Sequence, residues 1–562
     1  MFPIILIMSI LCHAGHAVDY GTDFVTAFPE NLAYYFPANL VLSLKITTFV
    51  PYTNVQIISN GTVINRSSVS TPKVFVVNIP NLEVNQIGFS FNALRITSNY
   101  NITVVSMSSR RDSIQINTVP PTNRLGVEYL VPAPNYNTLA LQLNKYNESR
   151  FISSTTEPTQ FSFSLIIINA ENVTNVVTVT QTSPTPGNGD IKLDPFELIL
   201  LPSNCSYSKV SSSAKVAVII TSPCVDTQNC RCNMVAHQLL PTNLMGTEFF
   251  FPSLKDQLPF TFSQLFVTSA DSVDLSSGSE KKTVAAGSTD LLPFYPETGS
   301  PVLTTTQPAF LSLVNPGLII DLIPKNMFSG CYLVHTTLQS QSQVLIIVET
   351  AKKEELQITS NPTTTSPGSS LSWKDVSGTS YSWALTPPNC KSCVIWHPTS
   401  PIAVYILETS PSGVIYGGPA ISVNDEPDPN GCVVVPMEFE LSNVTMSWRE
   451  ARVQCISNGL ALVSPNINYT QNKMAAALNN MNVEGFAWLG LRRNLVTSEW
   501  NWQNGANFDF ANWDNGQPTG NLCVGIWMEP NGNFTWRSIR CCESMQPLCV
   551  RDSVIFNSVD LI

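Results

Sequence analysis

Short apolar runs recur through residues 18–425, and each is bounded by Ser, Pro, Gly or Asn. Residues 176–180, 216–220, 344–348 and 403–407 are typical runs, rich in β-branched side chains. This length, composition and spacing predict short strands arranged as β-sandwiches. Frequent Pro residues between the runs fit edge strands and turns. We therefore expect a mostly β fold for this region.

One motif recurs within the region and predicts a repeat. Residues 121–129 read Pro-Thr-Asn-Arg-Leu-Gly-Val-Glu-Tyr, residues 241–249 read Pro-Thr-Asn-Leu-Met-Gly-Thr-Glu-Phe, and residues 21–24 are a weaker copy. Similar apolar stretches, 102–105 and 216–219, precede the two strong copies, and residues 402–405 resemble them. Chance recurrence of strand–Gly–strand patterns is the alternative, but the shared string favours serially repeated β-sandwich units.

The pattern changes after residue 425. Residues 426–431 contain Pro, Asp, Asn and Gly, which stop regular structure, so we expect a linker there. Residues 359–372, rich in Ser, Thr and Pro, are either a second linker or a loop inside the last sandwich.

An α+β domain is predicted from residue 432 to residue 551, followed by a tail, 552–562. Trp448, Ala451 and Cys455 lie at helical spacing on one face, and residues 460–463 suit a short buried strand. Residues 471–479 suit a second helix with Thr470 as its cap.

Length and composition indicate an exported chain of several domains. The 562 residues exceed what one core can serve, so three to five domains are expected. Residues 1–17 resemble a signal peptide, with an apolar core and small residues before the cleavage point. No other window is long and apolar enough for a membrane span, so the mature protein is expected to be soluble and secreted. The net charge of −11 disfavours binding to nucleic acid.

Cysteines and glycosylation signals agree with export. Of the 14 cysteines, Cys12 would leave with the signal peptide, and the odd remainder predicts one free or intermolecular thiol beside the disulfides. Such a thiol would allow covalent self-association. Asparagine glycosylation is expected at nine Asn-x-Ser/Thr sites: Asn60, Asn65, Asn101, Asn147, Asn172, Asn204, Asn443, Asn468 and Asn533.

No pattern in the chain indicates an enzyme, a metal centre or a cofactor. Cys230-x-Cys232 with His237 could suggest zinc, but disulfides suit an exported chain better. Residues 390–393 form a Cys-x-x-Cys without the thioredoxin-like context of a redox motif. His335 and His397, like His237, lie outside any nucleophile motif, although a triad could still assemble in space.

Two stretches resemble known families. The residues that carry the first resemblance are 215–218, Cys224, Cys230, Cys232, 237–241, 246–249, 402–405 and 416–418. With them, the stretch of about residues 21–420 resembles the N-terminal module of IgGFc-binding proteins. This resemblance implies a secreted, mucus-associated binding module.

The C-terminal resemblance is closer. It rests on an ordered set of motifs: Trp488-Leu-Gly-Leu, Trp500-Asn-Trp, Asn512-Trp513, Gln517-Pro518, Cys523, Trp536, Cys541 and Cys549. This set resembles the C-type lectin domain, which implies the disulfides Cys455–Cys549 and Cys523–Cys541. Cys432 and Cys542 are left over, and we expect them to pair with each other.

The resemblance also identifies five positions that bind calcium in other members. They hold Gln517, Thr519, Asn521, Arg537 and Ser538, none of which is negatively charged. Calcium needs six to eight oxygen ligands with several charges among them, so we expect no metal here.

We expect a calcium-independent lectin-like protein that binds glycans or glycoproteins in extracellular recognition or innate defence. The alternative is a structural mucus or matrix component that uses the lectin-like domain for protein–protein assembly. Trp488, Trp500 and Trp502 are expected mainly in the core, and Phe508, Phe510 and Arg537 at the surface. The candidate ligand-binding residues are Phe508, Phe510, Trp513, Gln517, Asn521 and Arg537.

Overall fold

The computed structural model describes residues 18–32, 39–111, 113–132, 163–181, 189–202, 207–227, 231–252, 254, 264–278, 280–286, 289–293, 302–315, 317–336, 342–361, 364–386, 392–409, 415–529 and 532–556. The expected signal peptide, 1–17, and the end of the expected tail lie outside these residues. Contacts divide the chain into two compact units, Met1–Val433 with Phe556–Ile562, and Val434–Ile555. No described helix is long and apolar enough to cross a membrane.

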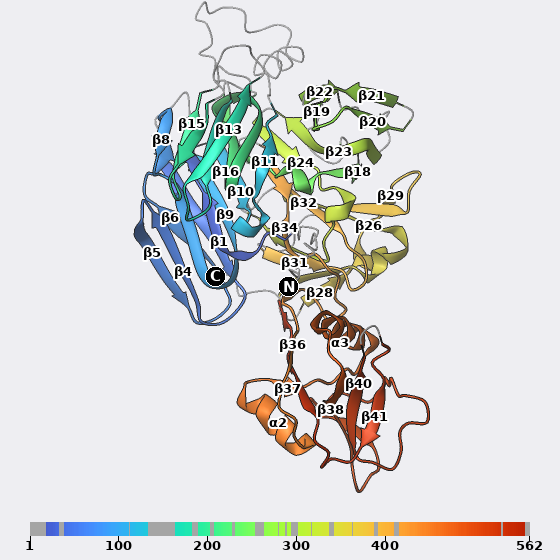
Figure 1. The fold of residues 1–562 in the computed structure, drawn as a ribbon. Coiled ribbons are helices and arrows are strands. Elements are labelled where there is room, and N and C mark those ends of the chain that lie inside the picture. Colours follow the sequence, from blue (N-terminus) through green and yellow to red (C-terminus); the bar gives the residue numbers. More distant parts are fainter. Residues whose placement is uncertain are drawn as a thin grey trace, which may run out of the picture. The chain divides into compact units, whose positions relative to one another are not determined.

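The first three sandwiches of the N-terminal unit are each built around one long strand (Figure 1). The strands of the first sandwich are β1 (Gly21–Thr26), β3 (Leu40–Thr48), β4 (Thr53–Ser59), β5 (Thr62–Val69), β6 (Val74–Ile79), the long strand β9 (Leu94–Arg110) and β10 (Ser113–Val119). One half of β9 pairs with β1 and β4, and the other half pairs with β3 and β10. The long strand therefore belongs to both sheets and joins them.

The second and third sandwiches repeat this design around the long strands β16 (Tyr207–Thr227) and β23 (Val302–Asn315). A short parallel pair, β2 (Phe28–Pro29) and β7 (Glu83–Val84), lies outside them. The second sandwich contains β8 (Gly88–Ser90), β11 (Gly126–Leu130), β12 (Ser164–Asn169), β13 (Asn175–Gln181), β14 (Ile191–Leu193), β15 (Leu198–Leu201), β16 (Tyr207–Thr227) and β17 (Arg231–Gln238). The third contains β18 (Gly246–Phe250), β19 (Gln264–Thr268), β20 (Val273–Ser277), β21 (Glu280–Val284), β22 (Thr289–Pro293), β23 (Val302–Asn315) and β24 (Leu318–Asp321).

The fourth sandwich consists of two five-stranded sheets. The first sheet holds β25 (Cys331–His335), β27 (Gln357–Asn361), β28 (Thr364–Pro367), β31 (Ser392–Trp396) and β34 (Ile421–Asn424). The second holds β26 (Ser342–Glu349), β29 (Lys374–Asp375), β30 (Tyr381–Thr386), β32 (Ala403–Thr409) and β33 (Ile415–Pro419). The described part of residues 359–372 lies inside this sandwich, as one of the two alternatives proposed, but most of it forms β27, β28 and the short 3-10 helix η5 (Gly368–Ser370) and not a loop. The third and fourth sandwiches share one continuous core.

The repeated motif joins successive sandwiches. Each strong copy forms a 3-10 turn, η1 (Thr122–Arg124) or η2 (Thr242–Leu244), followed by a strand with a bulge after its glycine. The glycine packs beneath the proline of the next copy, since a Cβ on Gly126 would lie 2.5 Å from the Cβ of Pro241. Such an approach requires glycine, which explains its place in the repeat.

The motif also has a copy that sequence inspection missed. Pro324 begins the turn η3 (Lys325–Met327), and a Cβ on Gly246 would lie 2.2 Å from the Cβ of this proline. Gly21 packs in the same way beneath Pro121. The series of glycine–proline contacts therefore runs from the first sandwich to the start of the fourth. Another 3-10 helix, η4 (Thr350–Glu355), belongs to the fourth sandwich.

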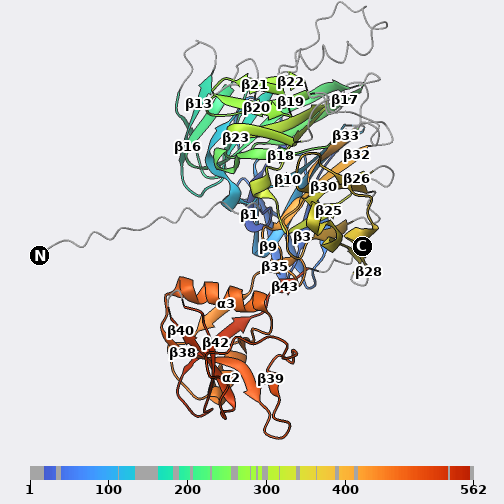
Figure 2. The ribbon, with the colours of Figure 1, turned by 90° about the vertical axis from the view of Figure 1, so that its right-hand side faces the viewer.

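The C-terminal unit is an α+β domain with a seven-stranded sheet. Helices α2 and α3 contribute to the two separate cores on opposite faces of this sheet (Figure 2). Its elements are β35 (Val433–Val435), β36 (Glu438–Leu441), α2 (Trp448–Ser457), β37 (Ala461–Leu462), α3 (Asn468–Met481), β38 (Gly485–Arg493), β39 (Trp500–Trp502), β40 (Cys523–Met528), β41 (Trp536–Ile539), β42 (Gln546–Arg551) and β43 (Val554–Ile555).

Helix α3 begins earlier than expected. Ile467 precedes its first turn and provides no side-chain cap, whereas Thr470 is buried inside the helix. The prediction of Thr470 as the cap is therefore wrong. The buried positions Thr470, Met474 and Leu478 share one face, and the packing of that face extends the helix beyond the local capping signal.

Candidate functional site

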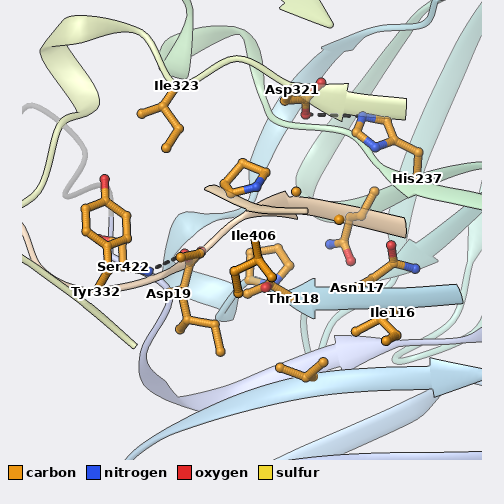
Figure 3. A pocket seen from close by; sticks show the side chains of 18 of the residues that line it. Asp19, Ile116, Asn117, Thr118, His237, Asp321, Ile323, Tyr332, Ile406 and Ser422 are labelled. Carbon is orange, nitrogen blue, oxygen red and sulfur yellow. Dashed lines mark hydrogen bonds and ion pairs between the residues drawn. The ribbon is translucent and has the colours of Figure 1, made fainter. Parts of the chain in front are cut away.

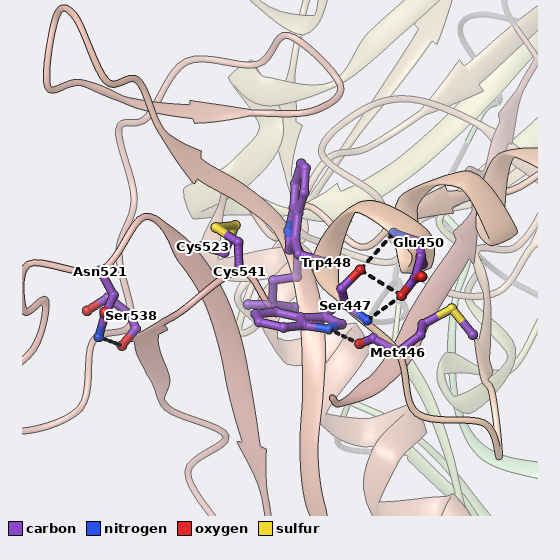
Figure 4. Close-up of a disulfide and its surroundings, with 10 residues drawn as sticks. Met446, Ser447, Trp448, Glu450, Asn521, Cys523, Ser538 and Cys541 are labelled. Atoms are coloured by element: carbon purple, nitrogen blue, oxygen red, sulfur yellow. Dashed lines mark hydrogen bonds between the residues drawn. A yellow bond between two sulfur atoms is a disulfide. The ribbon is translucent and has the colours of Figure 1, made fainter. Parts of the chain in front are cut away.

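Helix α2 anchors the lectin-like unit. The Ser447 hydroxyl accepts a hydrogen bond from the Glu450 main-chain N–H, and a Glu450 carboxylate oxygen accepts one from the Ser447 main-chain N–H at 3.0 Å (Figure 4). This reciprocal cap fixes the start of the helix. Trp448, Ala451 and Cys455 are all buried, as their helical spacing predicted.

Two disulfides link the sheet of this unit to helix α2 and to the loop after β41. Cys455 in α2 is bonded to Cys549 in β42, and Cys523 in β40 is bonded to Cys541, which follows β41 (Figure 4). Both pairs are those that the resemblance implied. The second pair lies beside the loop that carries Asn521, so it fixes one end of the candidate site.

The predicted pair Cys432–Cys542 is wrong. Cys432 is bonded to Cys331, and Cys542 is exposed with a free thiol. Cys331 begins β25 directly opposite Asn424 in β34, so the turn after β34 brings Cys432 within reach, with the two Cα atoms 5.5 Å apart. Cys224 and Cys393 are also disulfide-bonded, whereas Cys230 and Cys390 lie outside the described residues.

Four of the five positions that bind calcium in other members are occupied by neutral side chains that bond to one another. The side-chain oxygen Oε1 of Gln517 accepts from the Ser538 main-chain N–H at 2.9 Å and from the Ser538 hydroxyl at 3.1 Å. The Thr519 main-chain N–H donates to the Ser538 hydroxyl at 2.8 Å. The Asn521 amide donates to the Thr519 hydroxyl at 3.1 Å. It also donates to the Ser538 main-chain carbonyl oxygen at 3.2 Å (Figure 4). Direct hydrogen bonds thus connect the positions that a metal would otherwise bridge.

The fifth position, Arg537, is an ion-pair partner. Its Nε donates to a carboxylate oxygen of Asp514 at 2.7 Å, and this hydrogen bond holds the pKa of Asp514 below its usual value. The guanidinium group also lies over the rings of Phe486 and Trp527, at 5.5 and 5.6 Å from their centroids. Sequence reasoning missed Asp514, because the pair joins residues on different segments and leaves no local pattern.

The aromatic residues of the long loop form one cluster with the core. Phe510 and Trp513 both lie 5.8 Å from the Trp536 ring, measured between centroids, and Phe508 lies 6.3 Å from Trp502. Trp502 and Trp536 are buried, whereas Phe508, Phe510 and Trp513 are half-buried. The candidate rings therefore pack against the core and remain partly exposed. Trp488 is buried and Trp500 half-buried.

Among the described residues, no group of three or more His, Cys, Asp or Glu side chains could hold a metal ion. His237 pairs with Asp321 at 3.1 Å, and the Ser312 hydroxyl donates to the same carboxylate. The serine thus contacts the carboxylate, whereas in a catalytic triad the imidazole lies between the serine and the carboxylate. His397 uses both ring nitrogens in main-chain hydrogen bonds. These contacts are structural.

The described asparagines of the glycosylation sites are accessible. Asn60, Asn172, Asn443, Asn468 and Asn533 are exposed. Asn65 and Asn101 are half-buried, whereas Asn147 and Asn204 lie outside the described residues. Asn533 is close to the aromatic cluster, since its carbonyl oxygen accepts a hydrogen bond from the Asn512 amide.

Comparisons with known proteins cover both units. The family described as IgGFc binding protein matches residues 121–407, and the Lectin C-type domain matches residues 444–551. Both are families of non-enzymatic binding domains.

Individual relatives agree with these matches. Human IgGFc-binding protein is 24% identical over 388 residues, which cover 64% of this chain but 7% of that protein. Mouse lymphocyte antigen 75 is 30% identical over 107 residues, 18% of this chain and 6% of that protein. The chain thus spans a small part of the length of these relatives. Among solved structures, human lithostathine matches 21% of this chain and 92% of its own, at 19% identity and a TM-score of 0.20.

Proposed function

Because the chain belongs to the IgGFc-binding protein family and carries a C-type lectin domain at residues 444–551, we propose that it is a secreted protein that binds glycans or glycoproteins without calcium in extracellular recognition or innate defence. The matched families support binding as the general activity. The accessible asparagines of the glycosylation sites support an extracellular location.

One observation carries the proposal of calcium independence. Gln517, Thr519, Asn521 and Ser538 hydrogen-bond to one another. A calcium ion would have to replace these contacts without the carboxylates that normally compensate for its dehydration. The fifth position holds Arg537, whose guanidinium group already engages the nearby carboxylate of Asp514. Calcium would therefore meet too few free charged oxygens.

The long loop, 503–522, with Arg537, supplies the proposed binding face. It exposes Asn, Asp, Thr and Gly residues, whose amides, hydroxyls and main chain suit the hydroxyl groups of a sugar. Phe508, Phe510 and Trp513 are half-exposed beside them, and aromatic faces can pack against the apolar face of a sugar ring.

The test is a glycan-array screen of the full chain, with calcium and with a chelator. We expect binding in both buffers, reduced by Phe510→Leu and unchanged by Phe439→Leu. The control residue Phe439 is also half-buried, but it lies in β36, at the edge of the sheet away from β41. Loss of binding in chelator would contradict calcium independence. The absence of any bound glycan would contradict glycan binding.

A second function is a structural mucus or matrix component that assembles through the lectin-like domain. The exposed free thiol of Cys542 favours it, because such a thiol can link two chains. Electrophoresis without reductant tests this idea. A covalent oligomer that is absent in Cys542→Ser would support assembly, whereas a monomer under both conditions would argue against it.

A further inference from the structure

A cavity of about 190 Å³, partly open to the outside, lies in the N-terminal unit and is lined by all four sandwiches. Its walls include Lys45 of the first sandwich, Gln238 of the second, Asp321 of the third and Tyr332 of the fourth. Cavities of about 150 Å³ can hold a benzene-sized molecule. The space therefore suits a ligand of six to eight non-hydrogen atoms, or roughly six water molecules.

The acidic groups of the cavity already have partners. Asp19 accepts hydrogen bonds from Arg124 and from the Ser422 main-chain N–H, the latter at 3.0 Å. Asp321 pairs with His237 at 3.1 Å. Figure 3 shows Asp19 beside Ser422 and Asp321 beside His237, together with Tyr332, Ile323 and Ile406.

Glu408 accepts from Ser342 at 2.6 Å. With Asp19 and Asp321, it completes the acidic lining of the cavity. All three carboxylates therefore already accept hydrogen bonds, and a ligand that can only donate would share their oxygens with these partners.

Donors of the cavity, in contrast, remain free. Arg124 Nε, Gln238 Nε2 and the Tyr332 hydroxyl are buried without a hydrogen bond of normal geometry, although the Ser329 main chain lies near Tyr332. Arg124 and Gln238 nitrogens can only donate. Buried polar groups in folded proteins usually have partners, so such a cluster on one cavity indicates an absent acceptor.

The remaining wall is largely aliphatic. Ile116, Ile319, Ile323 and Ile406 line it. A ligand must therefore bring an apolar body as well as an oxygen acceptor. Lys45 also lines the cavity, where the carboxylate of Glu408 is a nearby opposite charge.

We propose that this cavity binds a small aliphatic molecule whose polar head is a carbonyl or carboxylate oxygen, held by the free donors of Arg124, Gln238 and Tyr332. The head group contacts the donors, and the aliphatic body contacts the isoleucine wall. This site is independent of the lectin-like unit and of the function proposed for it.

The test uses saturation-transfer NMR on the intact chain with 2-hexanone, hexanoate and hexylammonium as probes. The first two present oxygen acceptors, and the third presents only donors. We expect 2-hexanone or hexanoate to bind and hexylammonium not to bind. Gln238→Leu should weaken binding about two- to tenfold, as expected for one lost hydrogen bond. Gln264→Leu is the matched control, because Gln264 Nε2 is also buried and unpartnered but does not line the cavity.

The probes also separate the two head groups. Stronger binding of hexanoate that is lost in Lys45→Met would identify a carboxylate, whereas binding of 2-hexanone that is unchanged in that variant would identify a carbonyl. Three results would overturn the proposal: no probe binds, so that the cavity holds water alone; hexylammonium binds equally well; or both glutamine variants weaken binding equally. Thermal unfolding of each variant checks that it remains folded.

Discussion

Acidification should destabilise the N-terminal unit through His335. This side chain is buried, with Nε2 3.0 Å from the Thr47 hydroxyl and Nδ1 bonded to the Ser392 hydroxyl. Burial, and to a lesser extent the charge of Lys45, lower the pKa of His335 to about 3. The folded protein therefore keeps the imidazole neutral down to about pH 3.

The sign and size of the effect follow from linkage. An unfolded histidine has a pKa of about 6.5. Between about pH 3 and pH 6.5 the unfolded chain therefore binds a proton at His335 that the folded chain does not, and stability rises with pH across this window. A pH of 5 lies about 1.5 units below the pKa of the unfolded histidine, and each unit of this distance changes the free energy of unfolding by about 1.4 kcal/mol. Acidification from pH 7 to pH 5 should thus cost about 2 kcal/mol at this site.

Urea unfolding of the intact protein at pH 7, 6 and 5 measures the effect, with His335→Gln as the comparison. Glutamine cannot titrate but can still hydrogen-bond to the Thr47 and Ser392 hydroxyls. We expect the variant to lose about 2 kcal/mol of the pH dependence between pH 7 and pH 5. An unchanged pH dependence in the variant would refute the assignment to His335.

The other predictions concern packing and the free thiol. Tyr405→Phe should lower the free energy of unfolding by about 1–3 kcal/mol, because it leaves the buried main-chain N–H of Ile323 without its acceptor. Tyr332→Phe should leave the free energy of unfolding unchanged or raise it, because the buried Tyr332 hydroxyl has no hydrogen bond of normal geometry to lose. Gly246→Ala should cost about 1–3 kcal/mol, because the added methyl group would overpack against the proline ring above it. Gly418→Ala has open space around its Cβ and should change stability by less than about 0.5 kcal/mol. Urea unfolding of the four variants measures these differences. Cys542→Ser should abolish labelling of an exposed thiol in the folded protein without changing its melting temperature, as alkylation with mass spectrometry and calorimetry would show.

Local patterns were sufficient for the strands, the repeat and the lectin-like unit. The apolar runs at 176–180, 216–220, 344–348 and 403–407 lie within β13, β16, β26 and β32. Their length and bounding turn residues are properties of a few neighbouring residues, which a sequence displays directly. The order of tryptophans and cysteines likewise implied two of the disulfides in advance.

The candidate lectin site was only partly predictable. The sequence shows that Gln517, Thr519, Asn521 and Ser538 do not carry carboxylates. Their mutual hydrogen bonds could not be predicted, because they form only where the folded loop lies against β41. The pairing of Arg537 with Asp514 depends on the same meeting.

Only the tertiary structure decided the contacts between distant segments. The bond between Cys331 and Cys432 joins residues 101 positions apart, and the cavity takes walls from four sandwiches. Neither has a local signal, because each depends on how successive sandwiches pack against one another. The sequence by itself determined a mostly β chain with repeated sandwiches and a terminal lectin-like domain, since hydrophobic spacing and turn residues act over short distances. Which cysteine meets which, and which buried donors remain free, follow from the packing of the complete chain.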